Sequence, residues 1–429
     1  MIQCCCSVLV LCSLTFSRGA DWPRFRGPDG NGVAGEAKPP TTWSESENVK
    51  WKTPLPGPGS SSPIISGDRI FVTCYSGYGD ESGEGSLEKL QRHLVCVDRA
   101  SGKILWDSKV PAELPEDPYS GFITEHGYAS STPVTDGERV FVFFGKTGVL
   151  AFDFSGRELW RINVGKESGN RHWGSGASLV LFQDKVIVNA SEESQSIRAL
   201  DKMTGMEIWK SESKALELSY GTPALVPSGE RTDLVIAVPG EVWGMNPDSG
   251  KLRWFASTGM TGNVSPSVIA ADGVIYANGG FPTLGSAAVR GGGKGDVTST
   301  NILWESKEAS YVPSPVFSDG RLFVVNDQGF ALCLDAKDGK SIFRERLPGA
   351  SAQGRGGKPF YASTLLANGL IFALSRQNGT FIFEAKPEFK LIAHNKIAGD
   401  DSQFNGTPAM VDRQLFLRSN KNLYCLEAK

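Results

Sequence analysis

The sequence predicts an all-β fold: an eight-bladed β-propeller of four-stranded antiparallel blades, with the ring closed by an N-terminal strand. Three observations support it. A turn-and-tryptophan motif recurs along the chain, a second pair of strand-like segments recurs with it, and both ends of the repeat region are incomplete. The 50 glycines and 24 prolines among 429 residues, with 40% hydrophobic residues, are typical of a turn-rich β protein.

The first repeated motif is a tight turn followed by an aromatic residue, as in "DRASGKILW" from Asp98 to Trp106. An Asp or Asn that opens such a turn accepts hydrogen bonds from backbone N–H groups, and a glycine near its end adopts a positive φ. The motif therefore predicts a hairpin between two strands of each repeat, followed by an aromatic side chain that covers the next repeat. These structural roles are assigned to Asp98, Gly102, Trp106, Gly156, Trp160, Asp201, Gly205, Trp209, Gly250, Trp254, Trp304, Asp335, Gly339 and Trp51.

A second repeated segment precedes each hairpin. It begins with small residues, often with proline, and turns on Gly or Asp, as in "SSPIISGDRIFVT" from Ser61. Related segments begin near residues 130, 174, 221, 265, 314, 362 and 406. Each repeat thus contains four strands in about 40 to 50 residues, which is the period of a propeller blade.

The two ends of the repeat region complement each other. The last repeat stops at Glu427, the acid position of its turn, and has only three strands. "NVKWKTPL", Asn48 to Leu55, has the aromatic residue and the strand pattern but no hairpin before it. Pairing the two would complete the eighth blade and remove two exposed edges. We therefore expect a ring over residues 48–429, preceded by an N-terminal extension over 21–47.

Residues 1–20 form an apolar stretch that ends in small residues, as secretory signal peptides do. An uncleaved anchor is the alternative, although the apolar run is short for a membrane span. The sequence predicts a secreted, periplasmic or cell-envelope protein that does not span the membrane once the leader is removed. A lipid anchor on Cys12 is not expected, because the preceding residue is Leu11 rather than a small residue.

The extension over residues 21–47 has no copy elsewhere in the chain. We expect it to lie across one face of the ring, with Trp22 and Phe25 packed and with Arg24 and Arg26 paired to acidic residues. A ligand clamp is the alternative interpretation.

Charge and cysteine content exclude several classes of function. The formal net charge is −3, which argues against a nucleic-acid partner. The four cysteines beyond the leader are Cys74, Cys96, Cys333 and Cys425, and they form no CxxC motif. Cys96, Cys333 and Cys425 occupy equivalent strands of separate repeats, too far apart for disulfides. We expect a monomer.

Strand order predicts that one face carries the repeated turns and the other carries the longer connections. Long loops on an otherwise economical fold are often functional. Four insertions are assigned to the second face, and they contain the basic residues Arg290, Lys294 and Lys358. The insertions are Ser76–Arg92, Asp107–Gly127, Phe281–Asn301 and Leu347–Phe360.

Polar and aromatic residues just before the innermost strands are expected at the mouth of the central channel. Their convergence makes this the candidate site for a ligand or partner. The residues are His126, His172, Trp173, Tyr220, Asn263, Tyr311, Arg355 and Asn405.

No catalytic residue and no metal site is predicted. His126 and His172 alone do not make a metal site, because no third ligand is evident. "RGGGKGD", Arg290 to Asp296, lacks the Ser or Thr and the helix of a phosphate loop, so it is interpreted as a hairpin tip.

The "D-x-x-[ST]-G-K-x-x-W" repeat in a closed eight-bladed ring resembles the pyrroloquinoline-quinone-type (PQQ-like) propeller superfamily, which includes quinoprotein alcohol dehydrogenases and BamB-like proteins. The resemblance covers residues 48–429. Two repeats depart from it: the fifth keeps Trp304 without the turn glycine, and the seventh has Glu388 and Ile392 in place of the glycine and the tryptophan.

Quinoproteins that bind the quinone tightly tend to place a vicinal disulfide, a tryptophan platform and calcium ligands around it. The adjacent cysteines here, Cys4 to Cys6, lie in the leader, and no CxxCH is present. We therefore expect a non-catalytic, BamB-like platform that binds a protein or peptide without a cofactor, and the role in envelope or outer-membrane protein assembly is what the resemblance implies. The alternative is a dehydrogenase using PQQ with calcium, or a small-ligand-binding relative.

Overall fold

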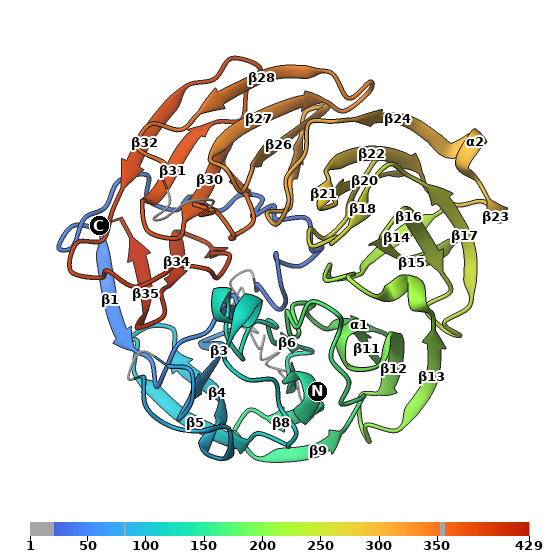
Figure 1. Ribbon diagram of the computed structural model, residues 1–429. Helices are drawn as coiled ribbons and strands as arrows, with labels where there is room; N and C mark the ends of the chain where they lie inside the picture. The colour runs from blue at the N-terminus through green and yellow to red at the C-terminus, as the bar shows by residue number, and fades with distance from the viewer. Residues whose placement is uncertain (1–20, 81–82, 352–356, 429) are drawn as a thin grey trace, which may run out of the picture.

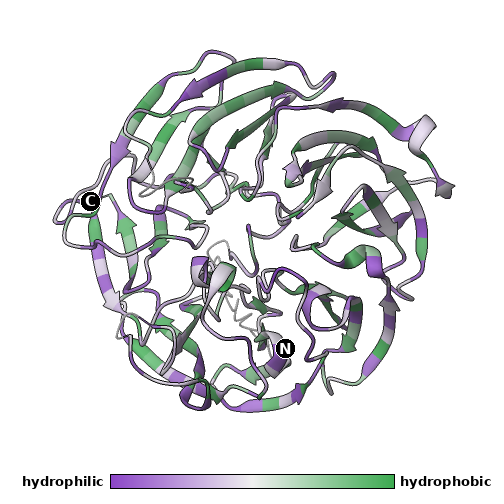
Figure 2. Cartoon of the chain, viewed as in Figure 1, coloured by the Kyte–Doolittle hydropathy of each residue, from purple (hydrophilic) through white to green (hydrophobic). Residues whose placement is uncertain are grey.

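The structure, a computed structural model, describes residues 21–80, 83–351 and 357–428. It is an eight-bladed β-propeller of four-stranded antiparallel blades arranged around a central axis (Figure 1), which confirms the predicted fold. Hydrophobic residues gather within the blades, and the outermost strands alternate between hydrophobic and hydrophilic residues (Figure 2). The predicted signal peptide lies outside the described residues.

Blades 1 to 4 follow one another in the first half of the chain, each with its first strand innermost. Blade 1 contains β2 (Ile64–Ser66), β3 (Arg69–Ser76), β4 (Gln91–Asp98) and β5 (Ile104–Pro111). Blade 2 contains β6 (Val134–Thr135), β7 (Arg139–Phe143), β8 (Val149–Asp153) and β9 (Glu158–Ile162). Blade 3 contains β10 (Val180–Phe182), β11 (Lys185–Ala190), β12 (Ser196–Asp201) and β13 (Glu207–Glu212). Blade 4 contains β14 (Ala224–Ser228), β15 (Arg231–Val238), β16 (Glu241–Met245) and β17 (Leu252–Ser257), and the two-residue strand β23 (Gly295–Asp296) pairs in parallel with β17 at its outer edge.

Blades 5 to 8 complete the ring. Blade 5 contains β19 (Ile269–Ala271), β20 (Val274–Gly279), β22 (Gly285–Arg290) and β24 (Ile302–Ser306). Blade 6 contains β25 (Val316–Ser318), β26 (Arg321–Val325), β27 (Phe330–Asp335) and β28 (Ser341–Arg346). Blade 7 contains β29 (Leu365–Ala367), β30 (Leu370–Ser375), β31 (Gly379–Glu384) and β32 (Leu391–Asn395). Blade 8 contains β33 (Ala409–Val411), β34 (Gln414–Arg418), β35 (Asn422–Glu427) and β1 (Val49–Pro54).

Short elements decorate the connections. They are the strand pair β18 (Thr261–Gly262) and β21 (Pro282–Thr283), the strand β23 (Gly295–Asp296), and the one-turn helices α1 (Ser191–Ser194) and α2 (Thr298–Asn301). Further 3-10 turns lie at Leu87–Lys89, Gly121–Glu125, Gly145–Thr147 and Lys214–Leu216. Among the described residues, no helix is long and apolar enough to cross a membrane.

The repeated turn forms as the sequence predicts. Asp98 Oδ1 accepts hydrogen bonds from the Ser101 hydroxyl at 2.5 Å and from the Ser101 N–H at 2.8 Å, and these two bonds lower the pKa of the Asp98 carboxyl. Gly102 has a φ of +75°, and a Cβ there would lie 2.6 Å from Trp51 Cδ2. Glycine is therefore required both by the backbone and by the aromatic ring of the preceding blade.

Most of the repeat tryptophans join one blade to the next. The Trp106 indole N–H donates to the Phe154 carbonyl in the turn of the following blade at 3.0 Å. Trp51, Trp160, Trp209 and Trp304 make the same contact with the next turn, at 2.9–3.1 Å.

Trp254 differs from the predicted repeat. Its N–H donates to the buried Asp233 carboxylate of its own blade at 2.9 Å rather than to a turn carbonyl. The corresponding connection of blade 5 is long and lacks the short repeated turn, so Trp254 turns inward over Gly244.

The N-terminal strand closes the ring, as predicted. β1 pairs antiparallel with β35, and Trp51 stands opposite Cys425. A second contact joins the last blade to the first inside the core, where the buried Arg418 of β34 donates to the carbonyl and the hydroxyl oxygen of Ser61 at 3.1 and 2.7 Å.

A ring of hydroxyl residues surrounds the central axis. In seven of the eight blade-to-blade joints, a backbone N–H donates to the hydroxyl oxygen of the equivalent Ser or Thr in the next blade, at 2.9–3.1 Å. We call these residues the hydroxyl ring. They are Ser62, Thr132, Ser178, Thr222, Ser267, Ser314, Ser363 and Thr407.

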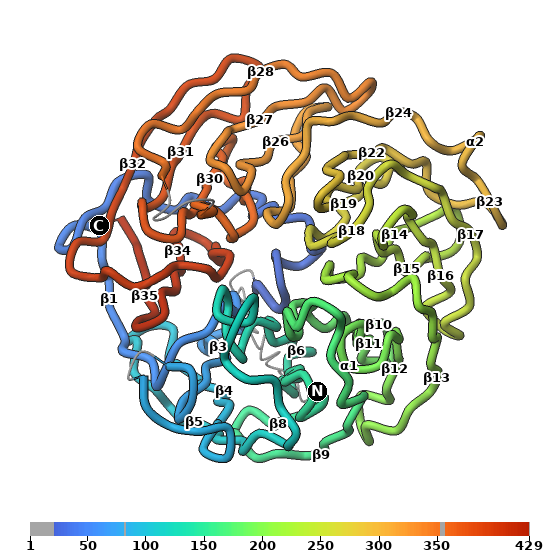
Figure 3. The backbone as a smooth tube through the Cα atoms, in the orientation of Figure 1, coloured from blue at the N-terminus to red at the C-terminus, as the bar shows by residue number. Residues whose placement is uncertain are grey.

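We call the side of the ring with the repeated turns the turn face and the opposite side the loop face. The N-terminal extension crosses the turn face, and its blue trace passes the centre of the ring in Figure 3. Trp22 pairs with Ile65 of blade 1, and Val33 pairs with Leu366 of blade 7. Trp22 is fully buried, as predicted.

The predicted acidic partner of Arg26 is not found. Arg26 is fully buried and donates to the carbonyls of Asn31, at 3.0 Å, and Pro315, and it forms no ion pair with any described residue. Burial without a counter-charge lowers its pKa to about 9. Burial also lowers the pKa of Arg24, and the negative charge of Asp29 partly offsets this lowering.

The assignment of the whole stretch 281–301 to one insertion on the loop face was wrong. Residues 285–290 form β22, the third strand of blade 5, and only the short connection before it lies on the loop face. Residues 291–301 join the third and fourth strands. This connection starts at the turn face, where the Gly291 N–H donates to the Gly273 carbonyl, and its residues 295–296 then pair with β17 at the outer edge of blade 4. Arg290 and Lys294 thus lie away from the channel mouth.

Candidate functional site

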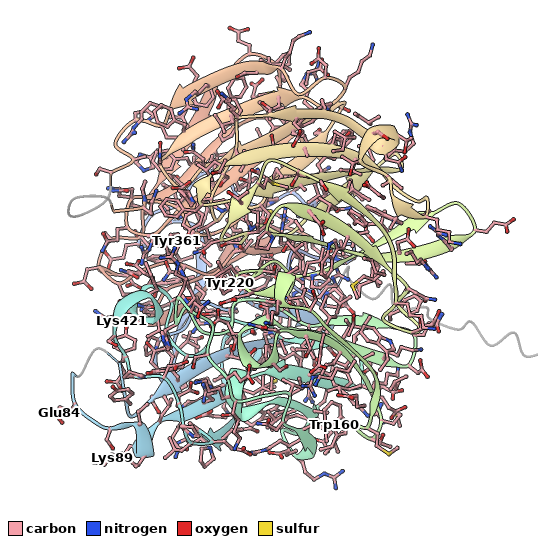
Figure 4. The ribbon with its side chains drawn as sticks, turned by 45° about the vertical axis from the view of Figure 1, so that its right-hand side comes forward. Glu84, Lys89, Trp160, Tyr220, Tyr361 and Lys421 are labelled. Carbon is pink, nitrogen blue, oxygen red and sulfur yellow. The ribbon has the colours of Figure 1, made fainter. Side chains whose placement is uncertain are left out.

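A central cavity of about 150 Å³ opens toward the loop face. Seven members of the hydroxyl ring line it, and Phe25 of the N-terminal extension also contributes to its wall. The position two residues before each ring hydroxyl forms a tier above them. This tier consists of Ser60, Ser130, Gly176, Tyr220, Ser265, Val312, Tyr361 and Asn405. In Figure 4, Tyr220 and Tyr361 lie near the middle of the molecule and Trp160 lies toward its edge.

A wider pocket of about 370 Å³ lies above the cavity, and Trp173 and Tyr361 line both spaces. We call it the mouth pocket. Blades from opposite parts of the ring contribute to it through their loop-face connections. Its lining includes Phe122, Glu125, Arg171, Trp173, Asn263, Phe281, Tyr311, Lys358, Tyr361, Arg376 and Gln403.

Aromatic rings form two walls of the mouth pocket. Phe122 stacks on Trp173 with ring centroids 4.9 Å apart and an angle of 4°, and His126 stacks on Trp173 at 5.8 Å. Phe281 packs against Tyr311 at 5.0 Å. The rings support one another, so the walls are held in place without a ligand.

Buried and half-buried ion pairs fix the polar groups of this pocket. Arg376 donates to Glu125 Oε2 at 2.8 Å and to Asn405 Oδ1 at 2.9 Å, which ties blade 7 to the connection between blades 1 and 2. Lys358 donates to the buried Asp327 at 2.6 Å and lies 5.9 Å from the Tyr311 ring centre.

Two polar atoms of the pocket's residues have no hydrogen-bond partner, namely Trp173 Nε1 and Asn263 Oδ1. Asn263 is 4% exposed, and its amide nitrogen donates to Tyr311 Oη at 3.1 Å. A buried donor and a buried acceptor without partners are costly unless water or a ligand satisfies them.

Two buried acids on helix α1 hydrogen-bond to residues at or near the cavity wall. Helix α1 carries Glu192, which accepts from Tyr220 Oη at 2.7 Å, and Glu193, whose carboxylate accepts from the Ser175 hydroxyl. Burial raises the pKa of Glu193 to about 7 and also raises that of Glu192. Both acids therefore retain protons at pH values where exposed acids are ionised.

His126 lines the cavity wall, and its Nδ1 forms a hydrogen bond with Ser130 Oγ at 2.5 Å. Removal from water lowers its pKa to about 4. Its imidazole is therefore neutral near neutral pH, which suits hydrogen bonding and stacking rather than charge pairing.

The structure brings together most of the predicted site residues. His126, Trp173, Tyr220, Asn263, Tyr311, Asn405 and Lys358 line the cavity or the mouth pocket. His172 does not: its side chain is 64% exposed and its Nδ1 lies 3.4 Å from Asp117. Arg290 and Lys294 lie away from the channel mouth, at the end of β22 and next to β23, and Arg355 lies outside the described residues.

Sequence reasoning missed Phe122, Arg171, Phe281, Tyr361 and Arg376 as individual site residues. A signal was present for Tyr361, because it precedes its ring hydroxyl by two residues, as Tyr220 does. Phe122 and Phe281 lie within stretches that were predicted only as insertions, whose side-chain directions the repeat does not specify.

Within the described part of the chain, no three His, Cys, Asp or Glu side chains converge as possible ligands. Cys74, Cys96, Cys333 and Cys425 are free and buried, so no vicinal disulfide faces the cavity there.

Comparison with known proteins shows similarity to one family. The family model described as outer membrane protein assembly factor BamB matches residues 90–345 and 293–380. No curated protein sequence matches the chain.

Solved structures share the fold at low identity. BamB from Moraxella catarrhalis is 13% identical with a TM-score of 0.61, over 89% of this chain and 97% of that one. Quinohemoprotein alcohol dehydrogenase from Comamonas testosteroni is 12% identical with a TM-score of 0.62, over 96% and 81%. A europium-containing methanol dehydrogenase is 10% identical with a TM-score of 0.60, over 96% and 98%. At these identities the likeness shows the fold and does not choose between the two kinds of protein.

Proposed function

Since the chain belongs to the family described as outer membrane protein assembly factor BamB, we propose that it is a non-catalytic, extracytoplasmic platform that binds another protein through its loop face. The proposal includes a monomeric ring that needs no cofactor and a partner drawn from envelope or outer-membrane protein assembly.

One observation carries the proposal. Phe122 and Phe281 are 44% and 46% exposed, come from connections of different blades, and both border the mouth pocket. Among the described residues, no other phenylalanine is as exposed. Exposed aromatic side chains around a pocket are typical anchors of protein interfaces, where a few residues supply most of the binding energy.

The rigidity of the surrounding ring favours binding without a large rearrangement. Phe122 is held by its stack on Trp173, and Phe281 by Tyr311. A partner that covers them therefore meets a preorganised surface and loses little conformational entropy of the platform.

The test compares two variants with matched changes on opposite faces. Phe122→Ser/Phe281→Ser removes the aromatic rim, whereas Met203→Ser/Met206→Ser removes two residues of the turn face that are 53% and 68% exposed. Affinity capture of the full-length protein from its own cells should retain the same partner with wild type and the methionine variant and lose it with the phenylalanine variant. Retention by all three proteins would refute the loop-face platform.

The same purified protein tests the dehydrogenase alternative, which the structural likeness to alcohol and methanol dehydrogenases keeps in view. PQQ is added with Ca²⁺, and quinone absorbance and dye-linked alcohol oxidation are followed. We expect no saturable binding. Saturable binding with turnover would replace the platform by a quinoprotein enzyme.

A further inference from the structure

We propose that the mouth pocket binds a short extended peptide segment through an acidic side chain that lies next to an aromatic one. This inference rests on the proposed platform function and names the chemistry that the platform recognises in its partner. It is drawn from the charge, the unpartnered polar atoms and the walls of the pocket.

The charge of the pocket favours a carboxylate. Three basic residues line it, and two of them are already neutralised: Arg376 by Glu125 at 2.8 Å and Lys358 by Asp327 at 2.6 Å. The third, Arg171, is exposed and forms no ion pair with a described residue. Arg171 is therefore available to pair with an incoming carboxylate, through either of its two terminal nitrogens.

The unpartnered atoms favour a peptide unit over a bare acid. Asn263 Oδ1 needs a donor and Trp173 Nε1 needs an acceptor, and both residues line the same pocket. The N–H and C=O groups of one extended peptide unit supply both. A simple carboxylic acid at neutral pH offers acceptors only and leaves the Asn263 oxygen unsatisfied.

The walls and the depth of the pocket limit the segment to a few residues. Phe122 and Trp173 form one wall and Phe281 and Tyr311 the other, and the two walls meet where Trp173 contacts Tyr311 edge-on at 6.5 Å, so an aromatic side chain can pack against either wall. A volume of about 370 Å³ is near the lower end of ordinary ligand pockets. The cavity beneath has Phe25 in its wall on the side of the N-terminal extension, so the segment enters and leaves through the loop face.

The experiment uses the full chain and three capped peptides that differ in one residue, Ac-Gly-Phe-Glu-Gly-NH2 and its Gln and Lys counterparts, in calorimetric titrations at low salt. We expect the Glu peptide to bind about fivefold more tightly than the Gln peptide and more than tenfold more tightly than the Lys peptide, as for one partly exposed charge pair. Equal affinities for the Glu and Lys peptides would overturn the proposal.

Charge reversal gives the matched control. Arg171→Glu should remove the preference for the Glu peptide and favour the Lys peptide, whereas Lys337→Glu, the same kind of change at an exposed position of the turn face, should leave the order unchanged. Trp173→Phe keeps an aromatic ring but removes the indole N–H, and should weaken the Glu peptide about threefold to tenfold. An unchanged order in Arg171→Glu would contradict the role of Arg171.

Two further outcomes separate this inference from the platform function. If glutarate, which carries carboxylates but no amide, binds as tightly as the Glu peptide, the site recognises a free acid and the peptide inference is wrong. If the peptides show no charge preference but partner capture still depends on Phe122 and Phe281, the platform stands and the carboxylate inference fails. Loss of both effects would refute the platform itself.

Discussion

Replacing Glu193 with glutamine should change how the stability of this propeller depends on pH. Glu193 is 2% exposed, and burial raises its pKa to about 7 from a usual value of 4.5. Between these values the folded protein holds a proton that the unfolded chain has lost. Its contribution is therefore fully present below pH 4.5 and is lost as the pH rises to 7. At about 1.4 kcal/mol per tenfold change in proton affinity, the loss is about 3 kcal/mol.

His126 works in the opposite direction. Its pKa falls from 6.5 to about 4 in the folded protein, so the unfolded chain binds the extra proton. Stability is full above pH 6.5 and is lost as the pH falls to 4. Because the ring is half-buried and partly screened by solvent, we expect about 2 kcal/mol rather than the full value of about 3. The two contributions overlap between pH 4.5 and 6.5 and largely cancel in the wild-type protein.

In each single variant, the unfolding free energy should vary with pH as the remaining residue, His126 or Glu193, dictates, because the opposing contribution is gone. Glu193→Gln should gain about 2 kcal/mol of stability from pH 4.5 to 6.5, whereas His126→Asn should lose about 3 kcal/mol from pH 4.5 to 7. Glu192 has a raised pKa as well and lies beside Glu193, so its share of the falling slope remains in both variants. Urea unfolding at pH 4.5, 5.5, 6.5 and 7.5, followed by tryptophan fluorescence, measures the slopes.

Direct titration checks the assignment. The chain has only four histidines, so the His126 ring resonance can be identified by comparison with His126→Asn and followed with pH by NMR. A Glu193→Gln profile parallel to that of the wild type, or a His126 resonance that titrates near 6.5, would refute the reasoning.

Two further predictions concern the joints between blades. Gly244→Ala should destabilise the protein by about 1–3 kcal/mol, because a Cβ at this position would lie 2.0 Å from Trp254 Cε2. The control Gly259→Ala should change the unfolding free energy little, because the nearest atom to its Cβ would be Glu305 Oε1 at 3.7 Å. Similar losses of stability in the two variants would contradict this prediction. Trp254→Phe should lower the free energy of unfolding by about 2–3 kcal/mol, because it leaves a buried Asp233 carboxylate oxygen without its donor. Trp106→Phe should lower it by only about 1 kcal/mol, because the indole N–H of Trp106 donates to a neutral carbonyl. Equal shifts of the urea midpoint in the two variants would refute this distinction.

The fold was predictable because the repeat fixes local geometry many times over. The Asp98 turn, the Gly102 backbone and the Trp106 contact each form as expected, and the missing strand of the last blade is supplied by β1. Blade 5 was the exception. Its third strand, β22, is rich in glycine and alanine and is followed by a long connection in place of the repeated turn. The sequence there thus showed neither the alternating apolar residues of a strand nor the turn motif that follows such a strand in the other blades.

The site was predictable only where the repeat reaches it. Tyr220 and Asn405 precede ring hydroxyls and were found by position, and Tyr361 could have been found in the same way. Phe122 and Arg171 lie in connections whose conformation depends on contacts between blades, such as the stack of Phe122 on Trp173. The lack of an acid beside Arg26 likewise follows from tertiary placement, since its partners are the carbonyls of Asn31 and Pro315.

The hydrogen bonds of the hydroxyl ring all point in the same direction around the centre of the protein. Each of its seven links runs from a backbone N–H to the next blade along the chain, so every internal joint uses one interchangeable chemical connection. The position that an eighth link would use, Ser62 Oγ, has no partner, and Arg418 crosses that seam instead. A whole repeat can therefore be duplicated or removed during evolution, or exchanged by design, without a new kind of joint, provided that the seam between the last and first blades is preserved.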